Sequence, residues 1–167
     1  MALRKINGIH LQNMLQNGLY ALMEQEEAIN RLNVFPVPDG DTGTNMRKTL
    51  ENGLRTAPST PVTGVFLKSL SEGMLFGARG NSGVILSQFF RGFYAELART
   101  EQIGPGEMRN GLVRAYRTAY KAVLHPVEGT ILSVTREGIE HIRGQIRRET
   151  SIESILAMYV AEMKKTL

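Results

Sequence analysis

Residues 33–46 read Asn-Val-Phe-Pro-Val-Pro-Asp-Gly-Asp-Thr-Gly-Thr-Asn-Met, a loop rich in Pro and Gly that leads directly into helical sequence. Its two carboxylates, Asp39 and Asp41, are one residue apart. On an extended backbone they would lie on the same side, where their mutual repulsion favours a bound cation. Oxygen ligands at this spacing suit a hard ion such as Mg²⁺. The loop therefore predicts a metal site.

The same loop has features of a phosphate site. Pro36 and Pro38 stiffen its approach, while Gly40 and Gly43 allow a sharp turn or a close approach to a ligand. A helix is expected from about Asn45, and its unsatisfied N–H groups would point back at the loop, where a phosphate is stabilised. The loop thus offers both partners of a metal-bound nucleotide.

Two other structures share features with this loop. A calcium-binding loop also begins Asp-x-Asp, but it needs Gly at its sixth place and Glu at its twelfth, where this chain has Thr44 and Leu50. An ordinary solvated turn, in which Asp and Gly only cap a helix, is a common structure. From these residues alone the ordinary turn stays open.

Composition places the chain among ordinary globular proteins. Its 167 residues are 42% hydrophobic and 22% charged, which predicts one domain, spanning residues 1–167, with a core of its own. No apolar run has membrane-spanning length and no secretory leader is recognisable, so a cytoplasmic location is expected. The chain has no cysteine, which excludes disulfides and thiolate zinc sites, and its three histidines are scattered.

The net charge of +4 discriminates poorly between partners. No basic motif is interleaved with aromatic residues, so nucleic-acid binding is not expected. One basic cluster, at Arg143, Arg147 and Arg148, is interpreted as a solvated helix face.

Apolar residues recur at helical spacing nearly everywhere, and no segment alternates as a strand does. We therefore predict an all-α, antiparallel up-and-down bundle of amphipathic helices. The expected helices span about Ile6 to Leu32, Asn45 to Leu54, Thr63 to Phe76, Ser82 to Ala98, Glu107 to Leu124, Thr130 to Arg147, and a last one through Lys165 with Thr150 and Glu153 as its capping box.

A second loop, Gly77-Ala78-Arg79-Gly80-Asn81-Ser82-Gly83, also precedes a helix. Its small residues expose backbone N–H groups and Ser82 adds a hydroxyl, which together suit an anion. It lacks the Gly-Lys-Ser/Thr ending of a P-loop, and a tight turn that allows close helix packing explains it equally well.

A third loop, residues 125–130, opens a helix at Thr130. Capping that helix is the simplest role for Thr130, and contact with a nucleotide is the alternative. In an antiparallel bundle, loops separated by two helices emerge at the same end. The three loops are separated in this way, so they can converge.

Together, residues 33–46, residues 77–88 (Gly-Ala-Arg-Gly-Asn-Ser-Gly-Val-Ile-Leu-Ser-Gln) and residues 126–132 (Pro-Val-Glu-Gly-Thr-Ile-Leu) resemble the nucleotide-binding domain of the dihydroxyacetone kinase superfamily. The similarity is greatest to the N-terminal kinase domain of bacterial fatty acid kinases and covers essentially the whole chain. It implies a barrel of eight antiparallel helices with ATP or ADP and two Mg²⁺ ions at one end.

The resemblance also implies roles for individual residues. The catalytic, metal-binding aspartates correspond to Asp39 and Asp41, and Asn33 stands near the place of a third aspartate found in the dihydroxyacetone kinase branch. The expected nucleotide-contacting positions are Asn45, Gly80, Asn81, Ser82, Gly83, Gly129 and Thr130.

The expected activity is phosphorylation of a fatty acid carboxylate that a separate fatty-acid-binding protein presents. The alternatives are a kinase acting on dihydroxyacetone or a related keto-alcohol, and a non-catalytic nucleotide-binding interaction module. Seven helices are counted where the family has eight, so the bundle is expected to lack its last helix. The chain then resembles the N-terminal portion of a longer multidomain protein, in which other domains could form a homodimer.

Overall fold

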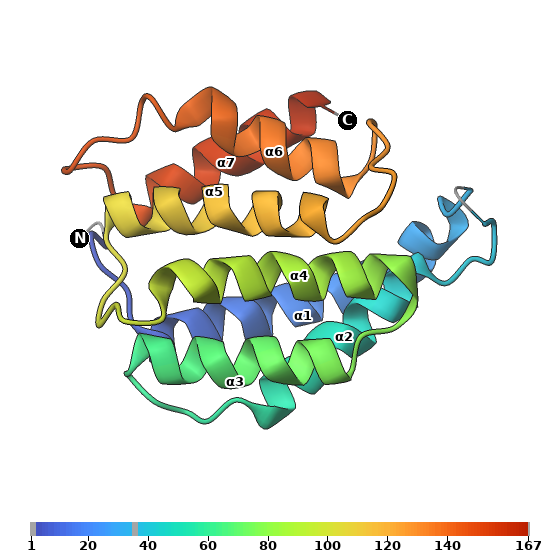
Figure 1. Cartoon of the computed structure of the whole chain (residues 1–167), viewed down its shortest axis with the longest axis horizontal. Coiled ribbons are helices and arrows are strands. Elements are labelled where there is room, and N and C mark those ends of the chain that lie inside the picture. The colour runs from blue at the N-terminus through green and yellow to red at the C-terminus, as the bar shows by residue number, and fades with distance from the viewer. Residues whose placement is uncertain (1–2, 35–36, 167) are drawn as a thin grey trace.

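The computed structural model describes residues 3–34 and 37–166, and within them it has seven α-helices and no β-sheet (Figure 1). The helices are α1 (Gly8–Arg31), α2 (Thr42–Thr56), α3 (Thr63–Phe76), α4 (Gly80–Leu97), α5 (Pro105–Lys121), α6 (Ile131–Ile142) and α7 (Ile152–Thr166). Successive helices run in opposite directions, and α1 to α4 form one half of the molecule with α5 to α7 as the other. The predicted all-α, up-and-down bundle is confirmed.

The core lies where the apolar faces of the helices meet. On α3, Phe66, Leu67, Leu70 and Met74 are fully buried, which makes this helix the most enclosed part of the lower half. Burying a side chain of this size contributes about 1.5–3 kcal/mol. The extensive contact between α4 and α5 joins the two halves. Because successive helices run in opposite directions, α2, α4 and α6 all begin at the same end of the molecule, on the right in Figure 1.

Several helix ends differ from the sequence prediction. Helix α1 begins at Gly8, because Ile6 is held in a two-way backbone hydrogen bond with Ile103. Helices α2 and α4 begin at Thr42 and Gly80, earlier than expected, so residues assigned to the loops form the first helical turns.

The connection between α6 and α7 corrects two further predictions. Helix α6 ends at Ile142 and does not continue to Arg147, because the chain turns there to place Ile146 in the core. Helix α7 is capped by Ser151, whose Oγ accepts the N–H of Ser154 at 3.1 Å. The expected pair of Thr150 and Glu153 does not form a capping box, since each accepts a different backbone N–H.

Thr150 Oγ1 accepts from Arg147 N at 2.9 Å, and the Glu153 carboxylate accepts from Leu3 N at 2.9 and 3.1 Å. These bonds fasten the N-terminal segment and the α6–α7 connection to each other. In the described part of the chain, no helix is both long and apolar enough to cross a membrane.

Candidate functional site

The first turn of α2 is capped by side chains from the end of α1. Asn30 Oδ1 accepts the N–H groups of Gly43 at 2.8 Å and Thr44 at 3.2 Å. Asn33 Oδ1 accepts those of Asp41 at 3.1 Å and Thr42 at 3.3 Å. The backbone donors that a helix start normally leaves open are therefore already used. The expectation that this helix start offers N–H groups to a phosphate is wrong.

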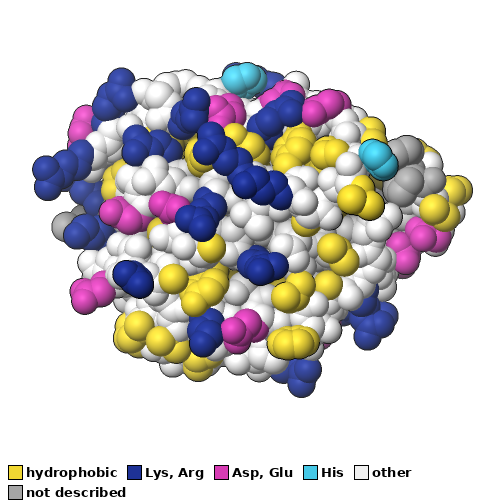
Figure 2. Space-filling view, in the orientation of Figure 1, with side chains coloured by type: hydrophobic (Ala, Val, Ile, Leu, Met, Phe, Trp, Pro, Cys, Tyr) yellow, Lys and Arg dark blue, Asp and Glu magenta, His cyan; other side chains and the backbone are white. Residues whose placement is uncertain are grey.

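This capping leaves the two aspartates of the loop uncommitted. Asp41 stands at the N-cap position of α2, yet its carboxylate makes no capping hydrogen bond. Neither Asp39 nor Asp41 has a side-chain partner among residues 3–34 and 37–166, and Asp39 is exposed. Figure 2 shows acidic side chains at the right-hand end of the molecule, where this loop lies. Two carboxylates without local partners are suited to hold a cation.

The backbone between the aspartates is turned rather than extended. Gly40 has a φ of 67°, and Asp41 has a ψ of 3°. The geometry assumed for the pair is therefore wrong in detail, although the carboxylates remain neighbours in one loop. Asn33 spans the same turn, since its Nδ2 donates to Val37 O at 3.0 Å. Its amide is engaged in holding the loop, and its role as a metal ligand remains a prediction.

Helix α4 begins without such a cap. Its N-cap residue, Arg79, has no side-chain capping bond, and the first intrahelical bond runs from Gly83 N to Arg79 O. No described side chain accepts the N–H groups of Gly80, Asn81 or Ser82. An open helix start carries positive partial charge, so it stabilises an anion.

Two contacts place this open helix start against α2. Ser82 Oγ donates to Thr42 O at 3.4 Å, and the backbone N–H of Arg79 donates to Thr49 Oγ1 at 3.3 Å. Thr49 is fully buried and also bonds Asn45 O at 2.7 Å, so it links the two helices. The first and second loops are thus brought together as the topology predicted.

Asn45 lies at the junction of these two helices. It is only 8% exposed, and its amide makes no hydrogen bond to any described residue, but the polar atoms of the amide reach the surface. A Cβ at Gly80 would lie 2.3 Å from Asn45 Nδ2, and Gly80 has a φ of 57°, so glycine is required there on two grounds. This unpaired amide beside an open helix start is the most ligand-like feature of the site.

Gly83 and Asn81 have different settings. Gly83 is buried, and a Cβ there would lie 2.4 Å from Thr49 Oγ1, so it allows α4 to approach α2 closely. This observation matches the packing alternative for the second loop. Asn81 is exposed on the first turn of α4. Contact of either residue with a nucleotide stays a prediction.

The third loop opens α6 at the same end of the molecule but is held by α5 and α6. Thr130 Oγ1 accepts from Leu132 N at 3.3 Å and donates to Val127 O at 2.8 Å, which confirms its capping role. Gly129 is exposed with a φ of 75°. Contact of Gly129 or Thr130 with a nucleotide remains a prediction.

A charged cluster holds the third loop in place. The two terminal guanidinium nitrogens of Arg136, Nη1 and Nη2, donate to the Glu128 carboxylate at 2.8 Å, and the guanidinium lies 5.4 Å from the centre of the Tyr120 ring. The hydrogen bond from Arg136 lowers the pKa of Glu128. Burial raises the pKa of Tyr120, whose hydroxyl donates to Glu128 at 3.3 Å.

Sequence reasoning did not identify the residues that position α2. Besides Asn30 and Thr49, these include Glu26, whose carboxylate accepts Thr44 Oγ1 at 2.6 Å and is also bonded by Arg47. The Thr44 hydrogen bond is the main cause of the lowered pKa of Glu26. These residues sit inside helices far along the chain from their partners, so no local pattern marks them.

The donor set at this end fits a divalent ion that is shared with a ligand. No group of three acidic or histidine residues that could hold a metal occurs in the described part of the chain. Mg²⁺ is commonly held by one or two carboxylates together with substrate phosphates and water. Asp39 and Asp41 meet that requirement if an anionic ligand sits at the start of α4.

Comparison with known proteins places the chain in a family. The DAK2 domain pattern matches residues 36–167. Protein YloV of Bacillus subtilis is 40% identical over 169 residues, covering 100% of this chain and 31% of that protein. An uncharacterized protein of Staphylococcus haemolyticus is 38% identical over 165 residues, covering 98% of this chain and 30% of that protein.

A third relative, from Staphylococcus aureus, is 43% identical over 138 residues, covering 81% of this chain and 25% of its own length. The chain thus spans less than a third of these relatives. Family membership rests on the match across all but the first 35 residues, which includes the second and third loops and residues 36–46 of the first. The chain belongs to the DAK2 domain family of the dihydroxyacetone kinase superfamily.

Proposed function

We propose that this chain is a Mg²⁺- and ATP-binding phosphotransferase domain that acts on a fatty acid carboxylate. The observation that carries the proposal is that two free carboxylates and an uncapped helix start lie next to each other. Asp39 and Asp41 have no local partners, and the neighbouring start of α4 has open N–H groups. A nucleotide with a bound cation requires this combination.

Each group has a defined task in this proposal. Asp39 and Asp41 would hold Mg²⁺, which supplies charge neutralisation on the phosphates, and Asn33 is a further candidate ligand. The first turn of α4 would hold phosphate oxygens through its N–H groups, and the Ser82 hydroxyl would exchange its long hydrogen bond to Thr42 O for one to a phosphate oxygen. Asn45 would orient the nucleotide with its amide. Catalysis then consists mainly of positioning and electrostatic stabilisation.

The acceptor chemistry needs no general base. A carboxylate is already ionised at neutral pH. One of its oxygens attacks the γ-phosphorus, the bond from that phosphorus to the bridging oxygen breaks, and ADP leaves with the electron pair. The products are an acyl phosphate and ADP.

The acyl chain is proposed to arrive on a second, fatty-acid-binding protein. Two pockets in the described part of the chain are lined mainly by charged residues, and neither of these two suits a hydrocarbon chain. Dihydroxyacetone or a related keto-alcohol is the alternative acceptor, supported by the superfamily match. A nucleotide-binding module without turnover is the other alternative.

Turnover by the full-length protein tests the proposal. ATP consumption and acyl phosphate formation would be measured with a lipid-loaded fatty-acid-binding protein, with that protein unloaded, and with dihydroxyacetone. We expect turnover only with the loaded protein. Turnover on dihydroxyacetone without a lipid carrier would establish the alternative acceptor. Mg²⁺-dependent nucleotide binding with no turnover on any acceptor would favour the non-catalytic module.

A further inference from the structure

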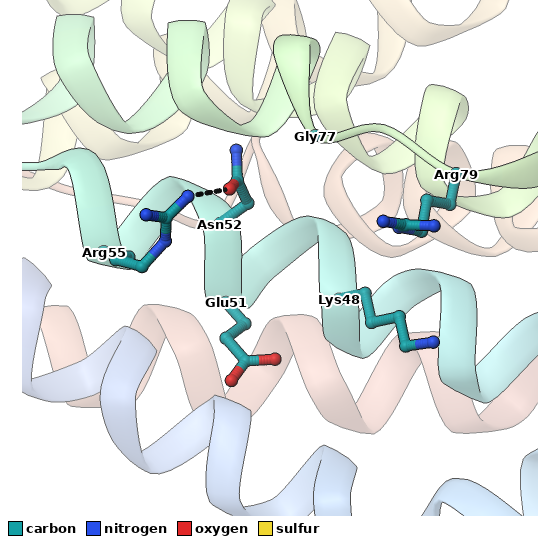
Figure 3. Close-up of a pocket in the computed structure, with 6 residues that line it drawn as sticks. All are labelled: Lys48, Glu51, Asn52, Arg55, Gly77 and Arg79. Atoms are coloured by element: carbon teal, nitrogen blue, oxygen red, sulfur yellow. Dashed lines mark hydrogen bonds between the residues drawn. The ribbon is translucent and has the colours of Figure 1, made fainter.

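A small basic pocket lies on the side of α2, between that helix and the connection from α3 to α4 (Figure 3). Its volume is about 210 Å³. It is lined by Lys48, Glu51, Asn52, Arg55, Gly77 and Arg79. Asp39 and Asp41 do not line it, so it is separate from the proposed metal site.

The floor of this pocket is rigid. Asn52 Nδ2 donates to Gly73 O at 2.6 Å, and its Oδ1 accepts Arg55 Nη2 at 2.7 Å. A Cβ at Gly77 would lie 2.5 Å from Asn52 Nδ2, so only glycine allows this approach. Asn52 is therefore held in place by the fold and offers Arg55 a hydrogen-bond acceptor.

The charges around the pocket are not balanced. Its one carboxylate, on Glu51, is bonded to Arg47 at 2.9 Å. Lys48 and Arg79 have no ion-pair partner within the described ranges, and Figure 3 shows that Lys48 comes from α2 and Arg79 from the connection between α3 and α4. Three of the six lining residues are cationic and only one carries a carboxylate, so the pocket favours an anion. A ligand with negatively charged oxygens is the chemistry that fits.

The size and place of the pocket indicate where that anion comes from. Pockets for nucleotides and other small molecules usually measure about 300–1,000 Å³, so this one holds little more than a single carboxylate-bearing side chain. Arg79 is also the N-cap residue of α4, which makes the pocket a neighbour of the proposed phosphate site. A protein that delivers an acceptor to that site must touch this part of the surface.

We propose that Lys48, Arg55 and Arg79 form a docking pocket for an acidic side chain of the protein that presents the acceptor. This inference rests on the proposed function for the identity of the partner. The chemistry of the pocket itself, an affinity for a peptide carboxylate, can be tested without it.

Two measurements on the full-length protein test the docking pocket. In the first, fluorescence anisotropy follows binding of a labelled hexaglutamate peptide to wild type, to Lys48→Gln with Arg79→Gln, and to a charge-matched control, Arg147→Gln with Arg148→Gln at the opposite end. We expect at least fivefold weaker peptide binding in the pocket variant and less than twofold change in the control. In the second, the KM for the lipid-loaded protein should rise at least fivefold in the pocket variant.

The outcomes separate the two proposals. If the wild type makes no acyl phosphate, the proposed function fails, and the peptide titration still decides whether the pocket binds carboxylates. Equal peptide affinity in the wild type and the pocket variant would overturn the docking pocket. So would a loss of affinity confined to the Arg147 and Arg148 control. If inorganic phosphate bound the pocket more tightly than the peptide and displaced it, the pocket would be a site for a free anion. This outcome would also overturn the docking pocket.

Discussion

The starts of α2 and α4 lie against each other, but the backbone N–H groups are capped by side chains in α2 and are uncapped in α4. Asn30 of α1 and Asn33, just after that helix, accept four N–H groups at the start of α2, whereas no described side chain caps α4. The capped start is accompanied by two carboxylates without partners. The uncapped start is accompanied by the unpaired amide of Asn45.

This difference explains how one site can bind both the cation and the negatively charged phosphates of a metal-bound nucleotide. If Asp39 or Asp41 capped α2, its carboxylate would be used by the fold. Capping from α1 leaves both carboxylates available for a cation. The open start of α4 remains available for the anion.

The largest effect on stability is expected from Gly80→Ala, which disturbs the uncapped start. The substitution forces a positive φ on alanine and displaces Asn45, so the free energy of unfolding should fall by about 3 kcal/mol. Nucleotide affinity should fall at least tenfold, because Asn45 and the first turn of α4 move. Urea unfolding and calorimetric titration measure the two effects.

Gly129→Ala is the matched control for that change. Gly129 also has a positive φ, 75°, but a Cβ there meets nothing within 4 Å. Its cost should be the backbone strain alone, about 1 kcal/mol. If Gly80→Ala and Gly129→Ala lost the same unfolding free energy, the contact with Asn45 would not contribute to the cost of Gly80→Ala.

Removing the cap of α2 should have a smaller effect. Asn30→Ala takes away the acceptor for two N–H groups and the donor to Thr44 Oγ1, at 3.0 Å, so we expect a loss of about 2 kcal/mol in chemical unfolding. Asn30→Asp keeps the acceptor oxygens and should lose less. If Asn30→Ala unfolds at the same urea concentration as the wild type, capping from α1 does not stabilise the start of α2.

The smallest effect concerns pH. The pKa of Glu26 is lowered in the folded state by its hydrogen bond from Thr44 and by Arg47, relative to an ordinary value of 4.5. Its stabilising contribution is therefore present above pH 4.5 and is lost as the pH falls through the lower, folded-state pKa. Because the side chain is 22% exposed, we expect a contribution of only about 0.5 kcal/mol.

Unfolding free energies between pH 6 and pH 3 check this prediction. Glu26→Gln should flatten the acid-side loss of stability, while Glu24→Gln, an exposed position on the same helix, should leave the profile as in the wild type. An unchanged profile in Glu26→Gln would mean that Glu26 does not hold α2 through its charge.

The sequence predicted the fold class, the number of helices and the meeting of the first two loops, because these follow from apolar spacing and antiparallel order. It did not predict the caps. Asn30 and Thr49 act on segments that are 13 and 30 residues away, which a local pattern cannot show. The start of α2 was therefore interpreted as open when it is closed.

Ends of helices were also hard to predict where burial decides them. Ile146 is buried in the core. To place it there, the chain leaves α6 after Ile142, although the helical spacing of apolar residues continues further. Residue chemistry alone predicts a metal and a phosphate at the first loop, whereas the individual nucleotide-contacting positions follow only from family resemblance.

The central claim is that Asp39 and Asp41 hold the cation of a nucleotide whose phosphates lie at the start of α4. Calorimetric titration of ATP into the protein, with and without Mg²⁺, tests it most directly when the wild type is compared with Asp39→Asn and Asp41→Asn. We predict Mg²⁺-dependent binding in the wild type, at least a hundredfold weaker binding in each variant, and almost unchanged stability to urea. Full Mg²⁺-dependent affinity in both variants would contradict the claim.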